Sequence, residues 1–410
     1  MVDSKAPPVT SLYIHVPFCA RKCAYCAFYS EPSSGELTNR CISALIRELE
    51  IVADDLKPKT IFIGGGTPSL LNLRQWEKIL RAMERLNLSG AEEFTVECNP
   101  ATLSPDKARL LRSSGVNRIS MGVQSLDEKL LERLGRIHTR EMVFKSVDTL
   151  RRAGFDNLNL DLMFAIPGQT LEIWRGTLTG ALTLGSEHLS SYEVIYEDDT
   201  PLFTQLQTGK FAVDEELACA MYEELVKRTT GAGFRQYEVA NFARGSRSNE
   251  STVQSPQSAP GCDPTGDGGL VTADIPVFAC KHNVNYWRGG AFYGLGPSAT
   301  SYVRGVRTKN QSKTRLYCEQ LEKGKRAIES REELPPLKRA GETAAFGLRM
   351  VAGWPFEEFQ RLTGFDLRDE WPGEMNQLVA CGWGRRDANH FHLTRQGLRF
   401  ADAAAELFLR

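Results

Sequence analysis

The chain has 410 residues, of which 41% are hydrophobic and 25% are charged, and its formal net charge is −1. This length allows one large domain and a smaller one, and the composition is typical of a globular protein. The balanced charge gives no reason to expect a nucleic-acid partner. No apolar run is long enough to span a membrane, and no targeting segment is evident. We therefore expect a cytoplasmic protein.

Strand-like and helix-like patterns alternate through the first half of the chain. Buried strands are predicted at Leu12–Val16, Thr60–Ile63, Phe94–Cys98, Arg118–Gly122, Leu158–Met163 and Leu189–Ile195. Amphipathic helices are predicted between them at Leu37–Leu56, Leu73–Leu86, Pro105–Ser113, Arg140–Ala153 and Leu171–Leu184. This alternation predicts a parallel sheet with right-handed crossovers. Because six units are fewer than the eight of a closed barrel, we expect an α/β fold with a partial (β/α)6 TIM-like barrel.

Three cysteines follow the first predicted strand, at Cys19, Cys23 and Cys26. In such folds the functional residues gather on the loops after the carboxyl ends of the strands, where this loop falls. Three thiolates on one loop can bind three irons of a [4Fe–4S] cluster and leave the fourth iron open for a ligand. A disulfide is disfavoured because no secretory signal precedes the loop. A zinc site with His15 as the fourth ligand is the alternative, although zinc sites usually pair two separated cysteine knuckles.

Glycine and polar residues end several of the other predicted strands. The segment Gly64–Thr67 lets the backbone approach a ligand closely and expose amide donors, although tight turns use the same residues. Glu97, Gln124 and Asp161 either cap the next helix or bind a polar ligand, and their occurrence on one rim favours a cofactor pocket. Arg136 is either a solvated arginine or a partner for a ligand carboxylate.

The composition changes after residue 244, which ends the first predicted domain at 1–244. Residues 245–279 are rich in Ser, Pro, Gly and Gln and are predicted to form a flexible insertion. Residues 280–333 form a connecting segment that begins with His282-Asn-Val-Asn-Tyr-Trp287 shortly after Cys280. Residues 334–410 are expected to form a small, mainly helical domain that ends in a short hairpin and a helix.

Together these motifs resemble the radical S-adenosylmethionine (SAM) superfamily, in which C-x₃-C-x₂-C holds a [4Fe–4S] cluster. In that superfamily the open iron chelates the methionine group of SAM, and electron transfer gives a deoxyadenosyl radical. Five segments further resemble the oxygen-independent coproporphyrinogen oxidase family. They are Tyr13–Cys19, Gly64–Ser69, Val96–Pro100, Ser120–Ser125 and Asp161–Met163. The resemblance covers nearly the whole chain except the Ser/Pro-rich segment.

The resemblance implies that Cys19, Cys23 and Cys26 hold the cluster and that nine residues contact SAM. The nine are Tyr13, Tyr25, Gly65, Gly66, Thr67, Glu97, Gln124, Arg136 and Asp161. Tyr25 would lie against the adenine, and the glycines and Thr67 would offer amides near the methionine moiety. Arg136 would meet the ligand carboxylate, and Asp161 would accept hydrogen bonds from the adenosine.

Two departures from the oxidase pattern point to a different member of this family. The oxidases carry a fourth cysteine where this chain has Phe28, and they carry a longer N-terminal extension before the first cysteine. Both departures resemble the HemW family of heme chaperones, which shares the segment His282–Trp287 and in which that segment is associated with heme. His282 could ligate heme iron, or it could belong to an interior network that closes the sheet; Cys280 is another conceivable ligand.

The resemblance therefore implies a chaperone that binds heme and delivers it to an acceptor such as a respiratory cytochrome or oxidase. The cluster would then support dimerisation or regulation rather than turnover, so a homodimer is a further expectation. The alternatives are an oxygen-independent coproporphyrinogen III oxidase and a radical SAM enzyme that acts on another substrate.

Overall fold

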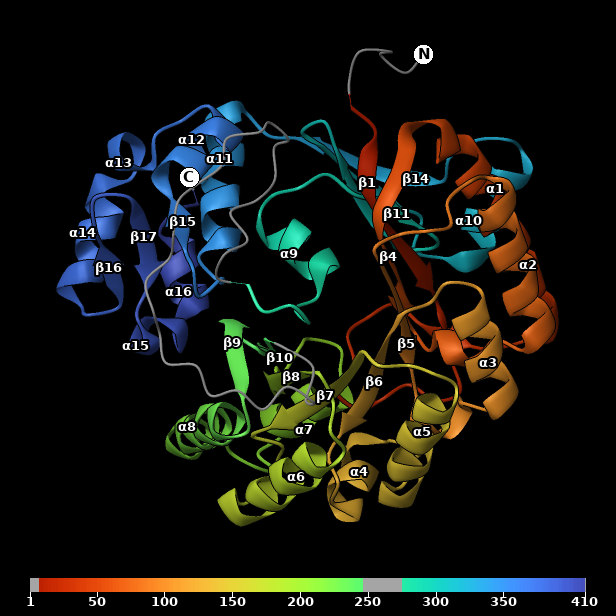
Figure 1. The fold of residues 1–410 in the computed structure, drawn as a ribbon, viewed down its shortest axis with the longest axis horizontal. Helices are drawn as coiled ribbons and strands as arrows, with labels where there is room; N and C mark the ends of the chain where they lie inside the picture. Colours follow the sequence, from red (N-terminus) through yellow and green to blue (C-terminus); the bar gives the residue numbers. More distant parts are fainter. Residues whose placement is uncertain (1–6, 246–274, 410) are drawn as a thin grey trace.

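A nine-stranded sheet forms the centre of the computed structural model, which describes residues 7–245 and 275–409. Its strand order is β11-β1-β4-β5-β6-β7-β8-β10-β9, and the run from β1 to β8 is parallel (Figure 1). The parallel strands are β1 (Val9–Val16), β4 (Leu56–Gly65), β5 (Glu93–Cys98), β6 (Arg118–Gln124), β7 (Leu158–Phe164) and β8 (His188–Glu193). The predicted six-stranded parallel α/β fold is confirmed. Among the described residues no pairing joins β9 to β11, so the barrel is partial.

Three further strands extend this sheet at its two ends. β11 (Tyr293–Leu295) pairs in parallel with β1, so the segment that follows the predicted insertion belongs to the same sheet as the N-terminal strands. At the other end β10 (Asn241–Arg244) runs antiparallel to β8 and pairs with β9 (Phe234–Glu238). None of these three strands was predicted.

Helices cover the outer face of the sheet (Figure 1). They are α1 (Gly35–Val52), α2 (Leu73–Arg85), α3 (Pro105–Ser113), α5 (Arg140–Arg152), α6 (Leu171–Thr183) and α8 (Glu215–Gly231). Two shorter helices, α4 (Glu128–Leu134) and α7 (Pro201–Gln207), pack instead beside Ala24 and Tyr25. Most begin at a polar cap: Asn72 and Gln75 form a capping box on α2, and Thr139 and Thr170 cap α5 and α6.

One predicted helix extends too far. α1 ends at Val52, a single 3₁₀ turn follows, and Leu56 already begins β4. The predicted helix therefore included the first residue of the next strand. Leu56 is buried as the first residue of β4, and it would also fit the buried face of a longer helix. Its apolar character therefore cannot distinguish a helix end from a strand start.

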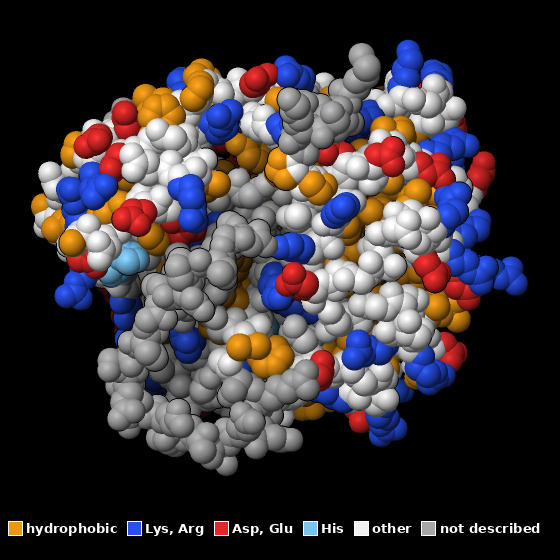
Figure 2. Space-filling model, turned by 45° about the horizontal axis from the view of Figure 1, so that its top comes forward, with side chains coloured by type: hydrophobic (Ala, Val, Ile, Leu, Met, Phe, Trp, Pro, Cys, Tyr) orange, Lys and Arg blue, Asp and Glu red, His pale blue; other side chains and the backbone are white. Residues whose placement is uncertain are grey.

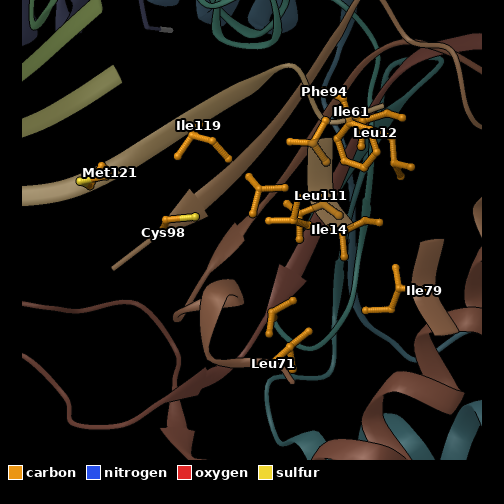
Figure 3. Packing of buried hydrophobic residues seen from close by; sticks show 14 of the residues in the cluster. Leu12, Ile14, Ile61, Leu71, Ile79, Phe94, Cys98, Leu111, Ile119 and Met121 are labelled. Carbon is orange, nitrogen blue, oxygen red and sulfur yellow. The ribbon is translucent and has the colours of Figure 1, made fainter. Parts of the chain in front are cut away.

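Side chains along the parallel strands alternate between the helices and the concave side of the sheet. Leu12 and Ile14 of β1 pack with Ile61 and Phe94 against the helices (Figure 3). The intervening Tyr13 therefore faces the opposite, concave side. This alternation places polar side chains inside the curved sheet.

Elements after the predicted insertion cover the concave side and one edge. α9 (Lys281–Trp287) lies on the concave side, where it contacts β4 (Figure 1). β12 (Thr300–Val303), β13 (Val306–Asn310) and β14 (Ile328–Glu333) form a separate antiparallel sheet. α10 (Thr314–Glu322) packs on α1.

The C-terminal region has its own hydrophobic core, which includes Trp354, Phe359, Trp371 and Phe391. Its helices are α11 (Pro336–Gly347), α12 (Phe356–Thr363), α13 (Leu367–Glu370), α14 (Pro372–Ala380), α15 (Arg395–Leu398) and α16 (Ala401–Glu406). Its sheet consists of β15 (Trp354–Pro355), β17 (His390–Leu393) and β16 (Gly384–Arg386) in that order. β16 and β17 form the predicted hairpin, and helices follow it as expected.

Most of the predicted insertion, residues 246–274, lies outside the described residues. Its last residues are described, and Phe278 and Ala279 pack in an apolar cluster with Tyr237, Val284 and Met350. Over the face shown in Figure 2, side chains of both charge signs are interspersed, as the near-zero net charge suggests. No described helix combines the length and apolarity that a membrane crossing requires.

Candidate functional site

The cysteine loop is closed at its base and anchored at its tip. Cys19 ends the short strand β2 (Phe18–Cys19), which pairs with β3 (Glu31–Pro32) on the far side of the loop. At the tip the Ala24 N–H donates to Leu134 O at 2.9 Å. The three cysteines are free and partly exposed, beyond the carboxyl end of β1 as predicted.

Hydrogen-bond donors from two other loops reach the cysteine sulfurs. The Thr67 hydroxyl lies 3.6 Å from Cys19 Sγ, and Arg136 Nη1 lies 3.4 Å from Cys23 Sγ. A hydroxyl and a guanidinium can both donate hydrogen bonds to a sulfur, including one that is bound to iron. The structure therefore brings two predicted ligand-binding residues, Thr67 and Arg136, to the predicted metal-binding loop.

The geometry of His15 does not fit the zinc alternative. His15 Nε2 donates to Tyr29 O at 3.1 Å, so Nδ1 accepts a hydrogen bond from the Tyr13 hydroxyl at 3.1 Å. Both ring nitrogens are thus engaged, and burial lowers the pKa of His15. No three His, Cys, Asp or Glu side chains of the described residues converge as a single metal ion requires. A cluster, in which each thiolate binds a different iron, does not need that convergence.

Two acidic side chains, Glu97 and Asp161, face the concave interior. Burial raises the pKa of Glu97 to about 8, and the negative charge of Asp161 contributes. Glu97 Oε2 accepts a hydrogen bond from the Gly65 N–H at 3.0 Å. Burial also raises the pKa of Asp161, against the hydrogen bonds that it accepts from Ser120 and Asn159. Because both charged forms are disfavoured, this interior is suited to a cationic ligand.

Asp161 also ends a chain of hydrogen bonds that begins at Tyr237 in β9. The Tyr237 hydroxyl lies 2.8 Å from His188 Nε2, His188 Nδ1 lies 2.6 Å from Asn159 Oδ1, and Asn159 Nδ2 donates to Asp161 Oδ1 at 2.8 Å. Since an amide oxygen only accepts, His188 carries its proton on Nδ1, and Tyr237 donates to Nε2. Burial lowers the pKa of His188, so the ring is neutral, as this arrangement requires. Every donor in the chain points toward Asp161.

The glycine segment after β4 is packed too closely for any side chain. A Cβ on Gly64 would lie 2.8 Å from the Glu97 carboxyl carbon, and one on Gly66 would lie 2.7 Å from Phe18 O. Gly65 has φ +105°, and a Cβ there would lie 2.5 Å from the His15 ring. These glycines therefore let the loop pack against β1, the cysteine loop and Glu97.

The N–H groups of this glycine segment are not available in the way that was predicted. The Gly65 N–H donates to Glu97, and the Gly66 and Thr67 N–H groups donate to Val16 O and Phe18 O, each at 2.8 Å. The prediction that these amides are free to meet a ligand was wrong, because they join the loop to its neighbours. The Thr67 carbonyl accepts a hydrogen bond from the Leu70 N–H at 2.9 Å, so this end of the segment is also tied into its own turn.

A bulge near the end of β6 sets the direction of the Gln124 side chain. The register between β6 and β7 shifts between Gly122 and Gln124, and Gln124 has φ 65°, which is unusual for a residue other than glycine. A Cβ on Gly122 would lie 3.1 Å from Gln124 Nε2 and 3.2 Å from Arg136 Nη2. Gly122 thus makes room for the two predicted SAM contacts, Gln124 and Arg136, to lie together. This role of Gly122 was not predicted, because a bulge leaves no periodic signal in the sequence.

Arg136 has one donor without a partner. Nη2 donates to Gly122 O at 2.6 Å and Nη1 points to Cys23, whereas Nε is buried and has no hydrogen bond to the described residues. A buried unpaired donor is uncommon in proteins, and a ligand carboxylate would satisfy it. The site residues therefore fit a group that carries both an ammonium and a carboxylate.

The two predicted aromatic contacts lie at different depths. Tyr13 lies in the interior, with its ring centroid 6.2 Å from that of Phe62, and burial raises its pKa. Tyr25 lies in the cysteine loop and packs against the apolar cluster of Leu134 and Leu202. Burial raises the pKa of Tyr25 despite the nearby Arg136 charge.

His282 is held inside the concave side of the sheet. Its Nδ1 lies 3.2 Å from Ser11 Oγ and 3.1 Å from Thr60 Oγ1, and its ring centroid is 5.3 Å from that of Phe62. Burial, with a contribution from the Arg118 charge, lowers the pKa of His282 to about 4, so the imidazole is neutral. This environment matches the interior-network alternative, and heme ligation by His282 stays a prediction.

Glu93 of β5 fixes the start of α9. Its carboxylate accepts hydrogen bonds from the Lys281 N–H at 2.8 Å and from the His282 N–H at 3.0 Å. Cys280 Sγ lies 3.4 Å from Glu93 Oε1, and burial raises the pKa of this thiol to about 12. Cys280 is therefore a protonated thiol, which disfavours it as a thiolate ligand.

Tyr286 and Trp287 end the same helix. Tyr286 is 40% exposed and packs against Trp287 and Phe346, with ring centroids 5.2 and 5.6 Å apart. The predicted aromatic surface is thus present at the carboxyl end of α9, one helical turn after His282.

Comparison with known families agrees with this geometry. Residues 13–179 match the radical SAM superfamily, and residues 334–400 match the HemN C-terminal domain. The chain is 33% identical over 401 residues to the heme chaperone HemW of Lactococcus lactis subsp. lactis (strain IL1403), covering 97% of both chains. It is 32% identical over 405 residues to the HemW of Bacillus subtilis (strain 168), covering 97% of this chain and 99% of that protein.

A solved structure resembles the whole fold. The coproporphyrinogen III oxidase HemN from Escherichia coli, described as a radical SAM enzyme, matches with a TM-score of 0.79 over 99% of this chain and 91% of that chain. The sequence identity is 19%, so this likeness shows the fold alone.

Proposed function

Because this chain belongs to the HemW family of the radical SAM superfamily, we propose that it is a heme chaperone that carries a [4Fe–4S] cluster and a SAM site. The observation that carries the proposal is the similarity to HemW proteins over nearly the full length of both chains. The cysteine loop adds support, since Phe28 is 70% exposed at the position where the oxidases carry a fourth cysteine.

Cys19, Cys23 and Cys26 would hold the cluster, which when bound supplies a redox-active iron with an open position for SAM. The unpaired Arg136 Nε would take the ligand carboxylate. The Glu97 carboxyl, with a pKa of about 8, holds its proton near neutral pH in the absence of a cation. A ligand ammonium beside Glu97 would favour the carboxylate, so we expect SAM binding to release a proton.

The remaining parts of the proposal concern cargo and partners. Heme would bind near α9, where Tyr286 and Trp287 offer aromatic surface and His282 is a neutral imidazole. The acceptor would be a respiratory hemoprotein, with a homodimer as the carrier form. A cytoplasmic location would keep the three loop thiols reduced for cluster binding.

A side-by-side assay tests this function. The protein is reconstituted anaerobically with iron and sulfide, loaded with hemin, and mixed with an apo-hemoprotein; a parallel reaction receives SAM, reductant and coproporphyrinogen III. We expect stoichiometric heme binding and transfer without protoporphyrinogen. Multiple-turnover conversion of coproporphyrinogen would contradict the chaperone function and favour the oxidase alternative.

A variant without the cluster is the control. The triple substitution Cys19→Ser, Cys23→Ser and Cys26→Ser removes every thiolate of the loop. The variant should lose the cluster absorbance while its far-ultraviolet circular dichroism stays unchanged. Any transfer that survives in it would be independent of the cluster.

A further inference from the structure

The backbone holds the Thr67 hydroxyl beside the first sulfur of the cysteine loop. This hydroxyl lies 3.6 Å from Cys19 Sγ. The Thr67 N–H donates at 2.8 Å to the carbonyl oxygen of Phe18, the residue directly before Cys19. Thr67 is therefore joined to this end of the loop by a backbone contact and a side-chain contact, so the hydroxyl cannot easily turn away from the sulfur.

Arg136 is held beside the second sulfur in a similar way. The end of α4 is bound to the cysteine loop, because the N–H of Ala24, the residue directly after Cys23, donates to Leu134 O at 2.9 Å. Arg136 Nη2 donates to Gly122 O at 2.6 Å, and Nη1 lies 3.4 Å from Cys23 Sγ. The guanidinium is thus fixed from two sides while one of its nitrogens faces the sulfur.

The hydrogen-bond donors are distributed unevenly over the three sulfurs. The Tyr25 hydroxyl lies within hydrogen-bonding reach of Cys23 and Arg136. Cys26 Sγ accepts from the backbone N–H of Phe28, and no side chain of the described residues donates a hydrogen bond to it. The donors that come from other elements of the fold therefore act on the first two cysteines.

Such donors change how readily a bound cluster is reduced. Hydrogen bonds to the sulfurs, net charge and solvent exposure set the reduction potential of an iron–sulfur cluster. An external one-electron donor such as dithionite supplies the electron, and no bond forms or breaks. The added negative charge is shared with the sulfurs, so a nearby donor or cation stabilises the reduced form more than the oxidised form. Arg136 is partly buried and brings a full charge, whereas Thr67 brings only a hydroxyl dipole.

We propose, resting on the cluster of the proposed function, that Thr67 and Arg136 are positioning residues that raise the reduction potential of this cluster through the sulfurs of Cys19 and Cys23. For Arg136 this role is separate from ligand binding, because Nη1 faces the sulfur and Nε is left for a ligand carboxylate. The potential of the protein without SAM therefore reports on the sulfur contacts alone.

Potentiometric titration of the reconstituted full-length protein without SAM, followed by the electron paramagnetic resonance of the reduced cluster, tests Arg136. Arg136→Met removes the donor and the charge. Its midpoint potential should fall by about 59 mV or more, which corresponds to a tenfold change for a one-electron couple. Arg136→Lys keeps a charge and should lie between the two. Arg133→Met is the control, because Arg133 is exposed on α4 and lies over the Phe211 ring, so its potential should match the wild type.

A hydroxyl-specific comparison tests Thr67. Thr67→Val removes the hydroxyl at nearly constant volume, so the midpoint potential should fall, by less than in Arg136→Met. Thr67→Ser keeps the hydroxyl and should stay close to the wild type. An equal fall in Thr67→Val and Thr67→Ser would contradict a hydrogen-bonding role for this residue.

Iron and sulfide content is measured for every variant, and potentials are compared only at full cluster occupancy. If Arg136→Met does not hold the cluster, Arg136→Lys and Thr67→Val carry the comparison. Wild-type midpoint potentials in the Arg136 variants and in Thr67→Val would overturn this inference and leave the chaperone function intact. Failure of the wild-type protein to take up a cluster would instead count against the proposed function.

Discussion

The ionisation of Glu97 is strongly shifted by its surroundings. Its pKa is raised from 4.5 to about 8 by burial and by Asp161. The folded protein therefore holds a proton that the unfolded chain releases above about pH 4.5. Since the folded state binds more protons in this window, the contribution of Glu97 to stability falls as pH rises from about 4.5 to about 8.

Glu97→Gln should remove this dependence. Gln carries no charge to bury, so the melting temperature of the variant should exceed that of the wild type at pH 8 and match it more closely at pH 5. Thermal unfolding of the apoprotein across this range measures the difference. Glu84→Gln, on an exposed position of α2, should leave the pH profile unchanged. A parallel shift of the Glu97→Gln curve at all pH values would contradict the raised pKa.

Substitution of Gly122 tests whether this glycine is needed so that Gln124 and Arg136 can lie close to the backbone of β6. A methyl group there would press against Gln124 Nε2 and Arg136 Nη2, whose flexible ends can move away. Gly122→Ala should therefore weaken SAM binding to the reconstituted protein by about tenfold, in keeping with the loss of one or two charge-assisted contacts.

The matched control for Gly122→Ala is Gly176→Ala. Gly176 lies within α6 and has nothing within 4 Å of an added Cβ, so this change should leave SAM binding unaltered. Its melting temperature should rise slightly, because alanine favours a helix. Equal SAM affinity in both variants, measured by isothermal titration calorimetry, would show that Gly122 does not position Gln124 and Arg136.

At the scale of elements, α9 depends on one carboxylate from the sheet. Glu93→Gln should remove the charged acceptor of the Lys281 and His282 N–H groups. Hydrogen bonds to charged groups contribute about 1.5–3 kcal/mol, so the free energy of unfolding in urea should fall by about that amount.

Amide hydrogen exchange should locate the effect of Glu93→Gln in α9. Glu92→Gln is the control, because Glu92 is exposed and pairs with the exposed Lys281 side chain. Unchanged protection of residues 281–287 would contradict the anchoring role of Glu93.

The elements predicted from sequence are those whose pattern is local. α3 (Pro105–Ser113) has the predicted boundaries, since Ser104 caps it and Pro105 suits its first turn. β11 and β10 were missed because they join β1 and β8 through contacts distant in sequence, and β9 was missed although it forms a local hairpin with β10. The position of the cysteine loop was predicted from the cysteine spacing. The grouping of the site residues at the carboxyl ends of the strands was predicted from the topology. Three features arise only from packing in three dimensions. They are the bulge before Gln124, the occupied amides of the glycine segment, and the cavity lined by His390 and His392.

At the scale of the whole molecule, Arg349 joins the C-terminal region to the main sheet. Its guanidinium pairs with the fully buried Glu238 at 3.1 Å and also lies 5.0 Å from the Trp287 ring. Arg349→Met should remove the ion-pair partner of the Glu238 carboxylate and lower the free energy of unfolding by about 2–3 kcal/mol. The loss should be smaller than for a fully buried pair, because the Arg349 side chain is 22% exposed.

Urea unfolding measures the Arg349 effect, with Arg361→Met as the exposed control in the same domain. The near-ultraviolet signal of the C-terminal tryptophans should then change at lower urea than the far-ultraviolet signal of the helices. Coincident transitions at the wild-type midpoint would contradict a role for Arg349 in holding the two regions together.

The hydrogen-bond chain from Tyr237 to Asp161 crosses the main sheet from β9 through β8 to β7. Tyr237 lines the cavity beside the C-terminal domain, and Asp161 is an expected SAM contact. A ligand that turns the Tyr237 hydroxyl away would leave His188 without its donor and change the field felt at Asp161. A ligand beside Tyr237 and a ligand at Asp161 would then bind cooperatively, and the factor by which one alters the affinity of the other must be the same in both directions.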